Sequence, residues 1–448
     1  MDSNTPQDKF NRQMSLNKVS RIAEGEITLD DVAEVLSQTI KDDDSNKKIV
    51  FLCMLSAFTE DSQINVTLNA PSATGKTYLA SEVAKLFPKQ DIIDKSGASP
   101  TSFLYGDGEI DKETGVKVVD LERKILIFYE MPNPLLQEKL RALLSHDDKE
   151  LHYSLTNKNK GRNKTDDVTI RGFSATIFCS AGLRLDEQET TRAILLSPEA
   201  TQAKILEAIK LRVRRGMDVA KFEEEIFWNY DRQMLMYRIA AIRDAHVRHI
   251  IVPNGNAIEK QFLQVVGILK PRHQRDIAHL MELIKCIALL NVWHRKNSSG
   301  QVVANQSDVD EGFKLWQEFF ESQNLNVSPV VLNFYNKYII PAYVYKMATA
   351  LRKDKGLWQE MKANHVGLTP QELNAYHRDV EGTSIPGEQV RKEYLPQLAS
   401  SGLIEWEKPQ SDDLDKRTRH IFPMALSEEN QKKVGTYRVE IKRLSDEW

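Results

Sequence analysis

One segment of the sequence has the residue types and spacing of a phosphate-binding loop. Residues 70–77 read APSATGKT, follow the apolar run INVTLN and open the amphipathic run KTYLASEVAKLF. The segment fits G-x-x-x-x-G-K-[ST], except that Ala70 replaces the first glycine. In such a loop, backbone N–H groups and a helix N-terminus enclose the β-phosphate, Lys76 reaches the β- and γ-phosphate oxygens, and the Thr77 hydroxyl ligates Mg²⁺. The segment therefore predicts a site for ATP and Mg²⁺ formed by Ala70, Pro71, Ser72, Ala73, Thr74, Gly75, Lys76 and Thr77.

A second candidate for chemistry is Glu130, which ends the apolar run KILIFYE at 124–130. Nucleotide hydrolases usually carry Asp-Glu at the end of such a strand, and here the pair is Tyr129-Glu130. At the carboxyl end of a strand beside the phosphates, Glu130 could polarise the attacking water. Tyr129 cannot ligate a metal as a carboxylate would, so Mg²⁺ would depend on Thr77, water and the phosphates. The alternative is a buried strand that ends in a surface glutamate.

A third apolar run, SATIFCSAG at 174–182, ends near Ser180. A polar group at that point could sense the γ-phosphate or the attacking water, although serine is also common at strand ends. Arg184 and Arg192 follow, and an arginine just after a core strand can project into the nucleotide site of a neighbouring subunit. Arg192 is the preferred candidate because it follows a short polar segment and precedes the apolar run AILL, while a solvated surface arginine is the alternative.

Between the second and third runs, the sequence predicts a β-hairpin with a basic connector. LHYSL and VTI alternate as strands do, and the connector TNKNKGRNKTDD is polar with Gly161 near its tip. A basic tip beside a nucleotide site indicates contact with a nucleic-acid backbone, although a solvated loop remains the alternative. The residues expected to bind DNA are Lys158, Lys160, Arg162 and Lys164. A second, acidic hairpin is expected at 105–122, and its charge does not indicate a role.

Composition sets limits on the kind of protein that carries these motifs. The chain has 448 residues, and its 61 Lys and Arg against 64 Asp and Glu leave a formal net charge of −3. A generally basic surface for nucleic acid is therefore excluded, and any such site must be local. The three cysteines lie far apart in apolar runs, as in proteins of a reducing cytosol. No apolar run approaches the roughly 18 residues of a membrane span, so a cytoplasmic protein without a membrane partner is expected.

The order of apolar patterns predicts an α/β fold with a parallel sheet, followed by helices and a smaller C-terminal part. Five parts are expected: an N-terminal helical segment at 1–45, a nucleotide-binding core at 46–200, a helical lid with linker helices at 201–325, a linker at 326–344 and a C-terminal domain at 345–448. In the first part, Thr28 is a candidate N-cap for a helix over 29–40.

The C-terminal domain is expected to contain helices near 345–362 and 369–380, a third helix that Gly402 ends, and two strands. The apolar face of the third helix is supplied by Val390, Tyr394, Leu395 and Leu398. The two strands, LIEWEKP and TRHIFPM, would form a wing with clustered cations at Lys416, Arg417, Arg419 and His420. This order resembles a winged helix, a fold that binds either DNA or other proteins.

Taken together, the motifs resemble an AAA+ ATPase of the pre-sensor-1 hairpin clade, most closely the MCM-like replicative helicases, including those of mobile elements. The resemblance covers about residues 46–325 and rests on GKT, the strand ending in Glu130, the basic hairpin before the SATIFCSAG strand, and the helical runs KPRHQRDIAHLMELIKCIALLN and ANQSDVDEGFKLW. It implies a P-loop AAA+ αβα core with a helical lid and a C-terminal winged helix. It also implies that Arg275, or secondly Arg272, is a sensor arginine touching the nucleotide. The sequence departs from the family at Ala70, at Tyr129, at Ser180 in place of the usual Asn, and in lacking a large N-terminal collar.

The resemblance implies an ATP-dependent DNA translocase or helicase that acts in replication of a mobile element or virus. It would work as a homo-oligomeric ring, with a hexamer expected, that holds a single DNA strand in its channel. One alternative is an ATP-driven assembly switch that recruits a partner such as a primase or transposase without unwinding. Another is a DNA-binding initiator whose ATP site is vestigial because Tyr129 replaces the aspartate.

Overall fold

The computed structural model describes residues 5–7, 9–10, 21–96, 108–112, 114–159, 162–182, 192–353, 367–408 and 418–424. The chain divides into two compact units, residues 1–323 and 324–448. Among the described helices, none is both long enough and apolar enough to cross a lipid bilayer.

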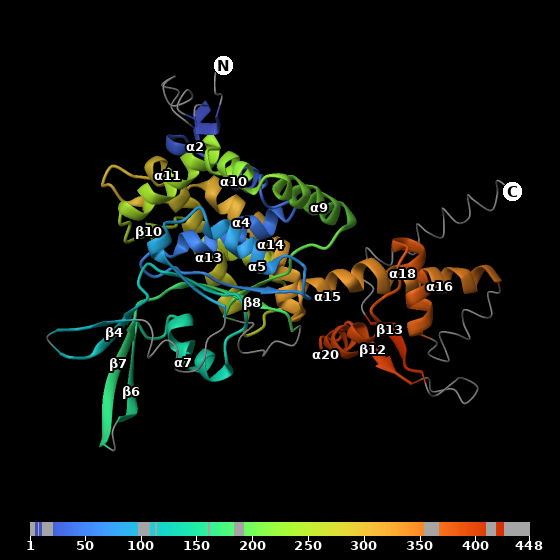
Figure 1. Cartoon of the computed structure of the whole chain (residues 1–448). Helices are drawn as coiled ribbons and strands as arrows, with labels where there is room; N and C mark the ends of the chain where they lie inside the picture. The colour runs from blue at the N-terminus through green and yellow to red at the C-terminus, as the bar shows by residue number, and fades with distance from the viewer. Residues whose placement is uncertain are drawn as a thin grey trace. The chain divides into compact units, whose positions relative to one another are not determined.

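The first unit is built on a five-stranded parallel sheet (Figure 1). Its strands lie in the order β2 (Ile92–Lys95), β5 (Ile125–Phe128), β8 (Ala175–Ser180), β1 (Asn65–Asn69) and β9 (Ile194–Leu196). The pairs β2–β5, β5–β8, β8–β1 and β1–β9 are all parallel. The predicted α/β class with a parallel sheet is therefore confirmed, as are the strands predicted within 64–70, 124–130 and 174–182.

Both faces of β5 and β9 are buried, which explains why these two strands (ILIF and ILL) are continuous apolar runs instead of alternating ones. On β5, Ile125 and Ile127 belong to one core and Leu126 and Phe128 to another. The first core is shared with α4 (Asp44–Ser56), α5 (Lys76–Ala84) and α13 (His273–Leu290). The second core is shared with α7 (Pro134–Leu144) and with a second sheet.

The second sheet has four strands in the order β3 (Glu109–Ile110), β4 (Lys117–Asp120), β7 (Arg162–Arg171) and β6 (Glu150–Asn159). β6 and β7 are antiparallel over ten residue pairs, from Glu150 opposite Arg171 to Asn159 opposite Arg162. The predicted basic hairpin is therefore present, but its strands are much longer than LHYSL and VTI because most of the polar connector is paired. Figure 1 shows β6 and β7 extending away from the helices of the first unit.

The two predicted hairpins form one sheet. β3 and β4 pair antiparallel within the segment expected to be an acidic hairpin, and β4 pairs in parallel with β7. The buried side chains of Val119 on β4 and Ile170 on β7 belong to the same core as Leu140 of α7. The acidic and basic hairpins therefore share one root, which rests on the parallel sheet through α7.

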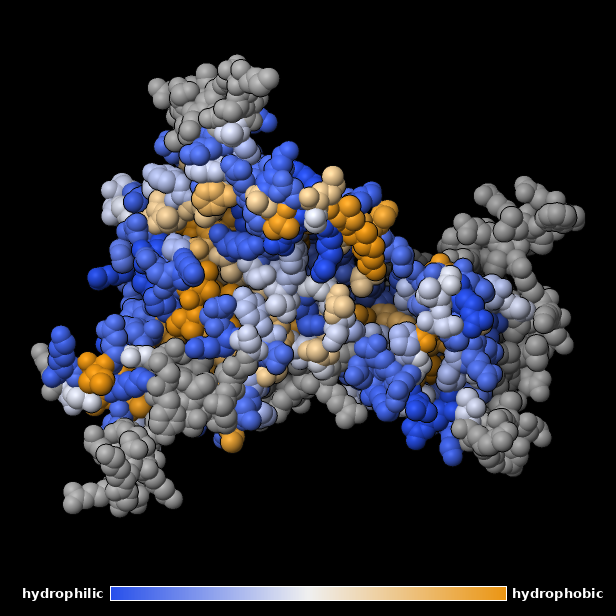
Figure 2. Space-filling view, in the orientation of Figure 1, coloured by the Kyte–Doolittle hydropathy of each residue, from blue (hydrophilic) through white to orange (hydrophobic). Residues whose placement is uncertain are grey.

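The rest of the first unit is mainly helical, as predicted for 201–325, with one short parallel pair of strands, β10 (Ile250–Ile251) and β11 (Val302–Val303). After α2 (Arg21–Glu24) and α3 (Leu29–Leu36), which Thr28 caps, the helices are α9 (Gln202–Met217), α10 (Val219–Phe227), α11 (Tyr230–Asp244), α12 (Gly255–Val266), α13 and α14 (Gln306–Leu325). No residue of α9 is buried, and its exposed apolar side chains recur every three or four positions. Figure 2 shows an apolar patch over α9 among hydrophilic residues, formed by Ile205, Leu206, Ile209, Val213 and Met217.

Arg238 of α11 connects the N-terminal helices to α13. Its side chain is fully buried, and its guanidinium donates to the carbonyl oxygens of Gly25 and Leu290, each at 2.7 Å, and to Asn291 Oδ1 at 2.9 Å. Burial lowers the pKa of Arg238 to about 10, so the side chain remains charged at neutral pH. One cation thus satisfies acceptors from two distant parts of the chain.

The second unit contains helices followed by a two-stranded antiparallel pair. Its elements are α15 (Pro329–Phe334), a π-helical turn (Tyr335–Ile339), α16 (Ile340–Lys353), α18 (Pro370–Glu381), α19 (Gly387–Gln389), a second π-helical turn (Val390–Tyr394), α20 (Leu395–Ser400), β12 (Ile404–Glu407) and β13 (His420–Pro423). The segment α19 to α20 is the predicted third helix, and its four predicted apolar residues are buried. Residues 326–344 are not a linker, because most of them are helical and Val331 and Ile339 are fully buried.

We expect Arg238→Leu to lower the free energy of unfolding by about 3 kcal/mol, because several buried acceptors lose their donor at once. Urea unfolding followed by circular dichroism measures the change. Arg248→Leu is the control, because Arg248 is exposed and its loss should change stability by less than about 0.5 kcal/mol. Equal, small effects of the two substitutions would contradict the role given to Arg238.

Candidate nucleotide-binding site

The phosphate-loop segment runs from the residue after β1 into the first two residues of α5, as predicted from its sequence. Two of its residues have a positive φ, Ala73 at 66° and Gly75 at 95°. A Cβ at Gly75 would meet no atom within 4 Å, so glycine is favoured there by backbone conformation and not by lack of space. Ala70 does not have a positive φ, and its N–H donates to the carbonyl oxygen of Ser180 at 3.3 Å. The position that departs from the motif therefore carries no conformational strain.

Lys76 is buried, and its ammonium is held inside the loop. Its Nζ donates to the carbonyl oxygens of Ala70 at 2.6 Å and Pro71 at 2.7 Å. Burial lowers the pKa of Lys76. Thr77, the next residue, is exposed, and Thr74 Oγ1 donates to the carbonyl oxygen of Pro71 at 2.9 Å. An anion in the loop would replace carbonyl oxygens as the partner of Lys76.

Two of the predicted residues, Ser180 and Glu130, share the carboxyl edge of the parallel sheet with this loop. Asn69 at the end of β1 is paired with Ser180 at the end of β8, and Phe128 at the end of β5 is paired with Phe178. Ser180 is buried, and its hydroxyl donates to the carbonyl oxygen of Gly182 at 3.0 Å. Glu130 follows two residues after β5 and is exposed. The edge thus brings together a cation, a hydroxyl and a carboxylate.

Two further residues lie at this edge, Cys179 and Asp94. Neither belongs to a sequence motif that predicts a site. Burial raises the pKa of the Cys179 thiol to about 11, although the charge of Lys76 and a hydrogen bond with Thr77 oppose the rise. Cys179 therefore lies against the loop. Burial, followed by the charge of Asp94, raises the pKa of Tyr129, so its phenol stays protonated at neutral pH. Asp94 on β2 is paired with Ile127 and so shares a sheet face with Tyr129, a placement that only the strand register reveals.

The residues present fit Mg²⁺ only together with a nucleotide. Among the described residues, no group of three or more His, Cys, Asp or Glu could hold a metal ion. Thr77 supplies an exposed hydroxyl, which suits a hard cation that also takes water and phosphate oxygens.

Arg192 and Arg275 lie together, but not beside the phosphate loop of their own chain. Both line a cavity of about 140 Å³ at the amino edge of the sheet, next to Asn65, the first residue of β1. Arg192 Nε donates to Ser145 Oγ at 2.7 Å. The arginines lie near the first residue of β1 and the phosphate loop follows its last residue. The length of β1 therefore separates these arginines from Lys76. Neither is positioned to contact a nucleotide in the loop of the same chain. Arg275 could therefore act as the sensor arginine only on a nucleotide bound by another copy of the chain.

Arg272, the second sensor candidate, is already engaged within the helical part. Its guanidinium donates to Asp276 at 3.2 and 3.3 Å and to Gln323 Oε1 at 2.9 Å. Arg184 lies outside the described residues, so its candidacy as the projecting arginine is not addressed by the structure.

The same cavity is lined by partly buried groups whose protonation differs from that in water. Burial lowers the pKa of His279 to about 4, and burial also lowers the pKa of His146. Burial raises the pKa of Glu282 to about 8, although the charge of Lys285 opposes the rise. At neutral pH the cavity therefore presents two neutral imidazoles and a largely protonated carboxyl beside its two arginines.

The basic hairpin is connected to the region of Glu130 by one helix. α7 begins four residues after Glu130, with Asn133 as its N-cap. At the root of the hairpin, the Tyr153 hydroxyl donates to the carbonyl oxygen of Lys139 at 2.7 Å, and Lys139 Nζ lies 5.4 Å from the centre of the Tyr153 ring. The backbones of Lys158, Arg162 and Lys164 belong to the paired strands, and Lys160 lies outside the described residues.

No model of a known protein family matches this chain, and no curated protein matches it in sequence. The assignment of the site therefore rests on its own geometry and chemistry.

Because Glu282 binds a proton more tightly in the folded chain than in the unfolded one, we expect its contribution to stability to fall as pH rises toward 8. Between pH 6.5 and 8, the free energy of unfolding should fall by at most about 1.4 kcal/mol per pH unit from this group. Glu282→Gln should flatten that slope in urea unfolding, whereas the exposed control Glu318→Gln should keep it. A slope that survives Glu282→Gln would assign the pH dependence to other groups.

Proposed function

We propose that this chain is an ATPase of the AAA+ type, similar to MCM-like helicases, that acts on DNA. The observation that carries the proposal is the common edge of a parallel sheet at which the phosphate loop with Lys76, the Ser180 hydroxyl and the exposed Glu130 meet. This edge is where ligands bind in open α/β sheets. A cation for phosphate and a carboxylate for water are the minimum that hydrolysis of a phosphoanhydride needs.

In the proposed reaction, the triphosphate enters the loop and Lys76 exchanges the carbonyl oxygens of Ala70 and Pro71 for phosphate oxygens. Thr77 would hold Mg²⁺, which neutralises charge on the β- and γ-phosphates. Glu130 orients the attacking water and accepts its proton, and Ser180 senses the γ-phosphate or the water. Tyr129 stays protonated against Asp94 and so acts as a hydrogen-bonding group, not as an anionic metal ligand.

A second copy of the chain would complete the site. The phosphate loop and the Arg192–Arg275 pair lie at opposite edges of the same sheet, so a head-to-tail neighbour could bring its arginines to this loop. Such heterologous contacts close into rings when the rotation allows it, and a hexamer is the proposed form. The exposed apolar stripe of α9 offers a further surface for such a contact.

The proposed work on DNA follows from the route between Glu130 and the basic hairpin. α7 leaves the Glu130 segment and packs against the root of β6 and β7, so a shift at the nucleotide edge would move the hairpin. With Lys158, Lys160, Arg162 and Lys164 at its far end, the hairpin would pull a single strand through the ring channel. The second unit, with its helices and two-stranded pair, is proposed to be a winged helix.

Steady-state ATP hydrolysis, measured with and without single-stranded DNA, tests the proposal. Lys76→Ala should abolish binding of a fluorescent ATP analogue, whereas Glu130→Gln should retain binding and slow hydrolysis by about 100-fold or more. Glu138→Gln is the matched control, because Glu138 is an exposed carboxylate of α7 and belongs to neither the loop nor the end of a sheet strand.

Each result of that assay points to one of the three functions. Strong stimulation by DNA supports the translocase. Turnover that ignores DNA favours the assembly switch that recruits a primase or another replication protein. Absence of turnover with retained DNA binding favours the initiator with a vestigial ATP site. Normal hydrolysis by Glu130→Gln would exclude Glu130 as the base.

Replacing Lys158, Lys160, Arg162 and Lys164 together by alanine should remove stimulation by DNA and leave basal hydrolysis intact, because the hairpin lies away from the phosphate loop. DNA affinity should also lose most of its salt dependence. The control replaces four exposed cations of the first unit, Lys210, Arg212, Lys221 and Arg248, by alanine. Retained stimulation in the hairpin variant would favour the switch.

A further inference from the structure

The helix α9 presents its apolar side chains to solvent. These residues, which we call the α9 stripe, recur every three or four positions, are 43–82% exposed, and are Ile205, Leu206, Ile209, Val213 and Met217. The less exposed positions of the helix lie on its other side and include Lys204, Glu207 and Arg215. A surface helix normally turns its apolar side toward the core of its own domain, so the orientation of α9 indicates a surface that another molecule covers.

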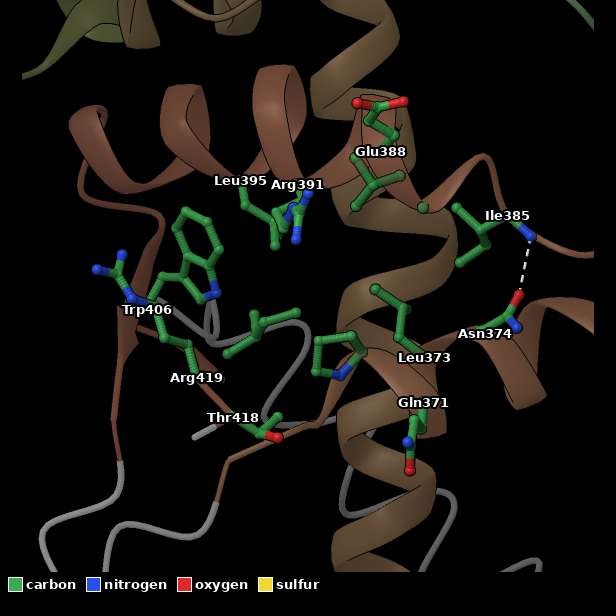
Figure 3. Close-up of a pocket in the computed structure, with 14 residues that line it drawn as sticks. Gln371, Leu373, Asn374, Ile385, Glu388, Arg391, Leu395, Trp406, Thr418 and Arg419 are labelled. Carbon is green, nitrogen blue, oxygen red and sulfur yellow. Dashed lines mark hydrogen bonds between the residues drawn. The ribbon is translucent and has the colours of Figure 1, made fainter. Parts of the chain in front are cut away.

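The second unit shows how apolar residues look when the chain covers them itself. Leu373 and Leu395 line the groove drawn in Figure 3, yet they are only 1% and 2% exposed. The residues of the α9 stripe have no comparable cover from their own chain.

Positive charge borders the α9 stripe. α9 contains five Lys and Arg residues and one carboxylate, Glu207. Four of these cations form ion pairs within the chain. The fifth, Arg212, lies three residues after Ile209 and forms no ion pair with a residue that the structure describes. A surface that matches the stripe should therefore place an apolar side chain beside carboxylates.

The acidic hairpin of β3 and β4 has this composition. Ile110 on the edge strand β3 is 69% exposed, and its neighbours Glu109 and Asp111 are exposed as well. We call these three residues the hairpin tip. The segment around it, DGEIDKE at 107–113, has four carboxylates and one cation. Figure 2 shows an apolar spot among hydrophilic residues where this hairpin leaves the first unit.

The α9 stripe belongs to the carboxyl edge of the parallel sheet. α9 follows β9, and it lies near the start of α5, since the charges of Arg215 and Arg212 act on Tyr78. Burial, followed by the charge of Glu82, raises the pKa of Tyr78 to about 12, and the two arginines oppose that rise. The stripe is therefore on the same side of the sheet as the phosphate loop.

The hairpin tip belongs to the amino edge. β4 ends at Asp120, and the chain turns there into the first residue of β5, Ile125. Figure 1 draws α9 and β4 on opposite sides of the first unit. A head-to-tail neighbour, which sets the amino edge of one copy against the carboxyl edge of the next, would bring the hairpin tip toward the α9 stripe.

Other occupants match the α9 stripe less well. Packing α9 of one copy on α9 of another would bring two positively charged helices together and leave Arg212 without a carboxylate. A nucleic-acid backbone would pair with Arg212 but would not cover the apolar side chains. The hairpin tip supplies both an apolar side chain and carboxylates.

We propose that the hairpin tip of one copy packs on the α9 stripe of the next copy, with Ile110 among the apolar side chains and Glu109 beside Arg212. The inference rests on the head-to-tail assembly put forward in the proposed function, but it does not need ATP hydrolysis. Each copy would then give one hairpin and receive another, so its two contacts with neighbours are different.

Sedimentation velocity of the full chain, with and without an ATP analogue that is not hydrolysed, measures this assembly. A hairpin variant, Glu109→Lys with Ile110→Gln, and an α9 variant, Ile209→Gln with Val213→Gln, should each weaken association at least about tenfold. The four side chains are exposed, so circular dichroism should not change.

The control replaces two exposed apolar residues of the second unit, Val380→Gln with Met424→Gln, and should associate as the unmodified chain does.

A mixture of the two variants separates this contact from other arrangements. The hairpin variant keeps its α9 stripe and the α9 variant keeps its hairpin tip, so together they should form a two-chain species that neither forms alone. Energy transfer between a donor dye on one variant and an acceptor dye on the other measures that species, and its affinity should be within about twofold of that of the unmodified pair.

Three results would overturn the proposal: a monomeric unmodified chain, normal association of the hairpin variant, or no pairing in the mixture. Loss of binding to anionic vesicles or DNA by the α9 variant, with its self-association unchanged, would assign the stripe to that surface instead. ATP hydrolysis is measured in parallel. Its absence with assembly intact would count against the ATPase proposal and leave this contact standing.

Discussion

The organisation of the first unit depends on a parallel sheet that is buried on both faces. Charged and reactive side chains are favoured at the ends of such strands, because the interior positions face one core or the other. β8 lies between β1 and β5, so the three motif-bearing strands end side by side. The phosphate loop, Ser180 and the Tyr129-Glu130 pair are therefore gathered at the carboxyl edge, and Arg192 and Arg275 at the amino edge. The polar residues of the site therefore form two groups, one at each edge of the sheet. The proposed ATPase mechanism uses both groups, one from each of two neighbouring subunits.

Much of this arrangement could be predicted from the sequence because its signals are local. A run such as KILIFYE has the length and β-branched character of a strand, and Gly75-Lys76-Thr77 combines a left-handed turn with the start of a helix. The N-cap at Thr28 is likewise a property of neighbouring residues and was predicted. Ala70 fits in place of the motif's first glycine because its φ is not positive, and that φ depends on the course of the whole loop.

The features that were missed depend on contacts between distant segments. The polar residues of the hairpin connector have no alternation of apolar side chains, and they are strands because β6 and β7 pair with each other. Asp94 became a candidate only through the register of β2 against β5. Residues 326–344 looked like a linker, yet their apolar side chains pack within the second unit. Arg275 was expected beside the nucleotide by resemblance, and its place at the amino edge follows from how α13 packs on α4.

The position of Lys76 bears on how the loop would release an anion in the proposed function. Its ammonium already has two carbonyl acceptors within the loop, at 2.6 and 2.7 Å. An anion that leaves the loop therefore does not strand a buried positive charge, because both carbonyl oxygens are within reach at once. In the proposed function, release of the anion would replace one set of hydrogen bonds by another and leave the ammonium with acceptors. The loop would then accommodate both the filled and the empty state without unfolding.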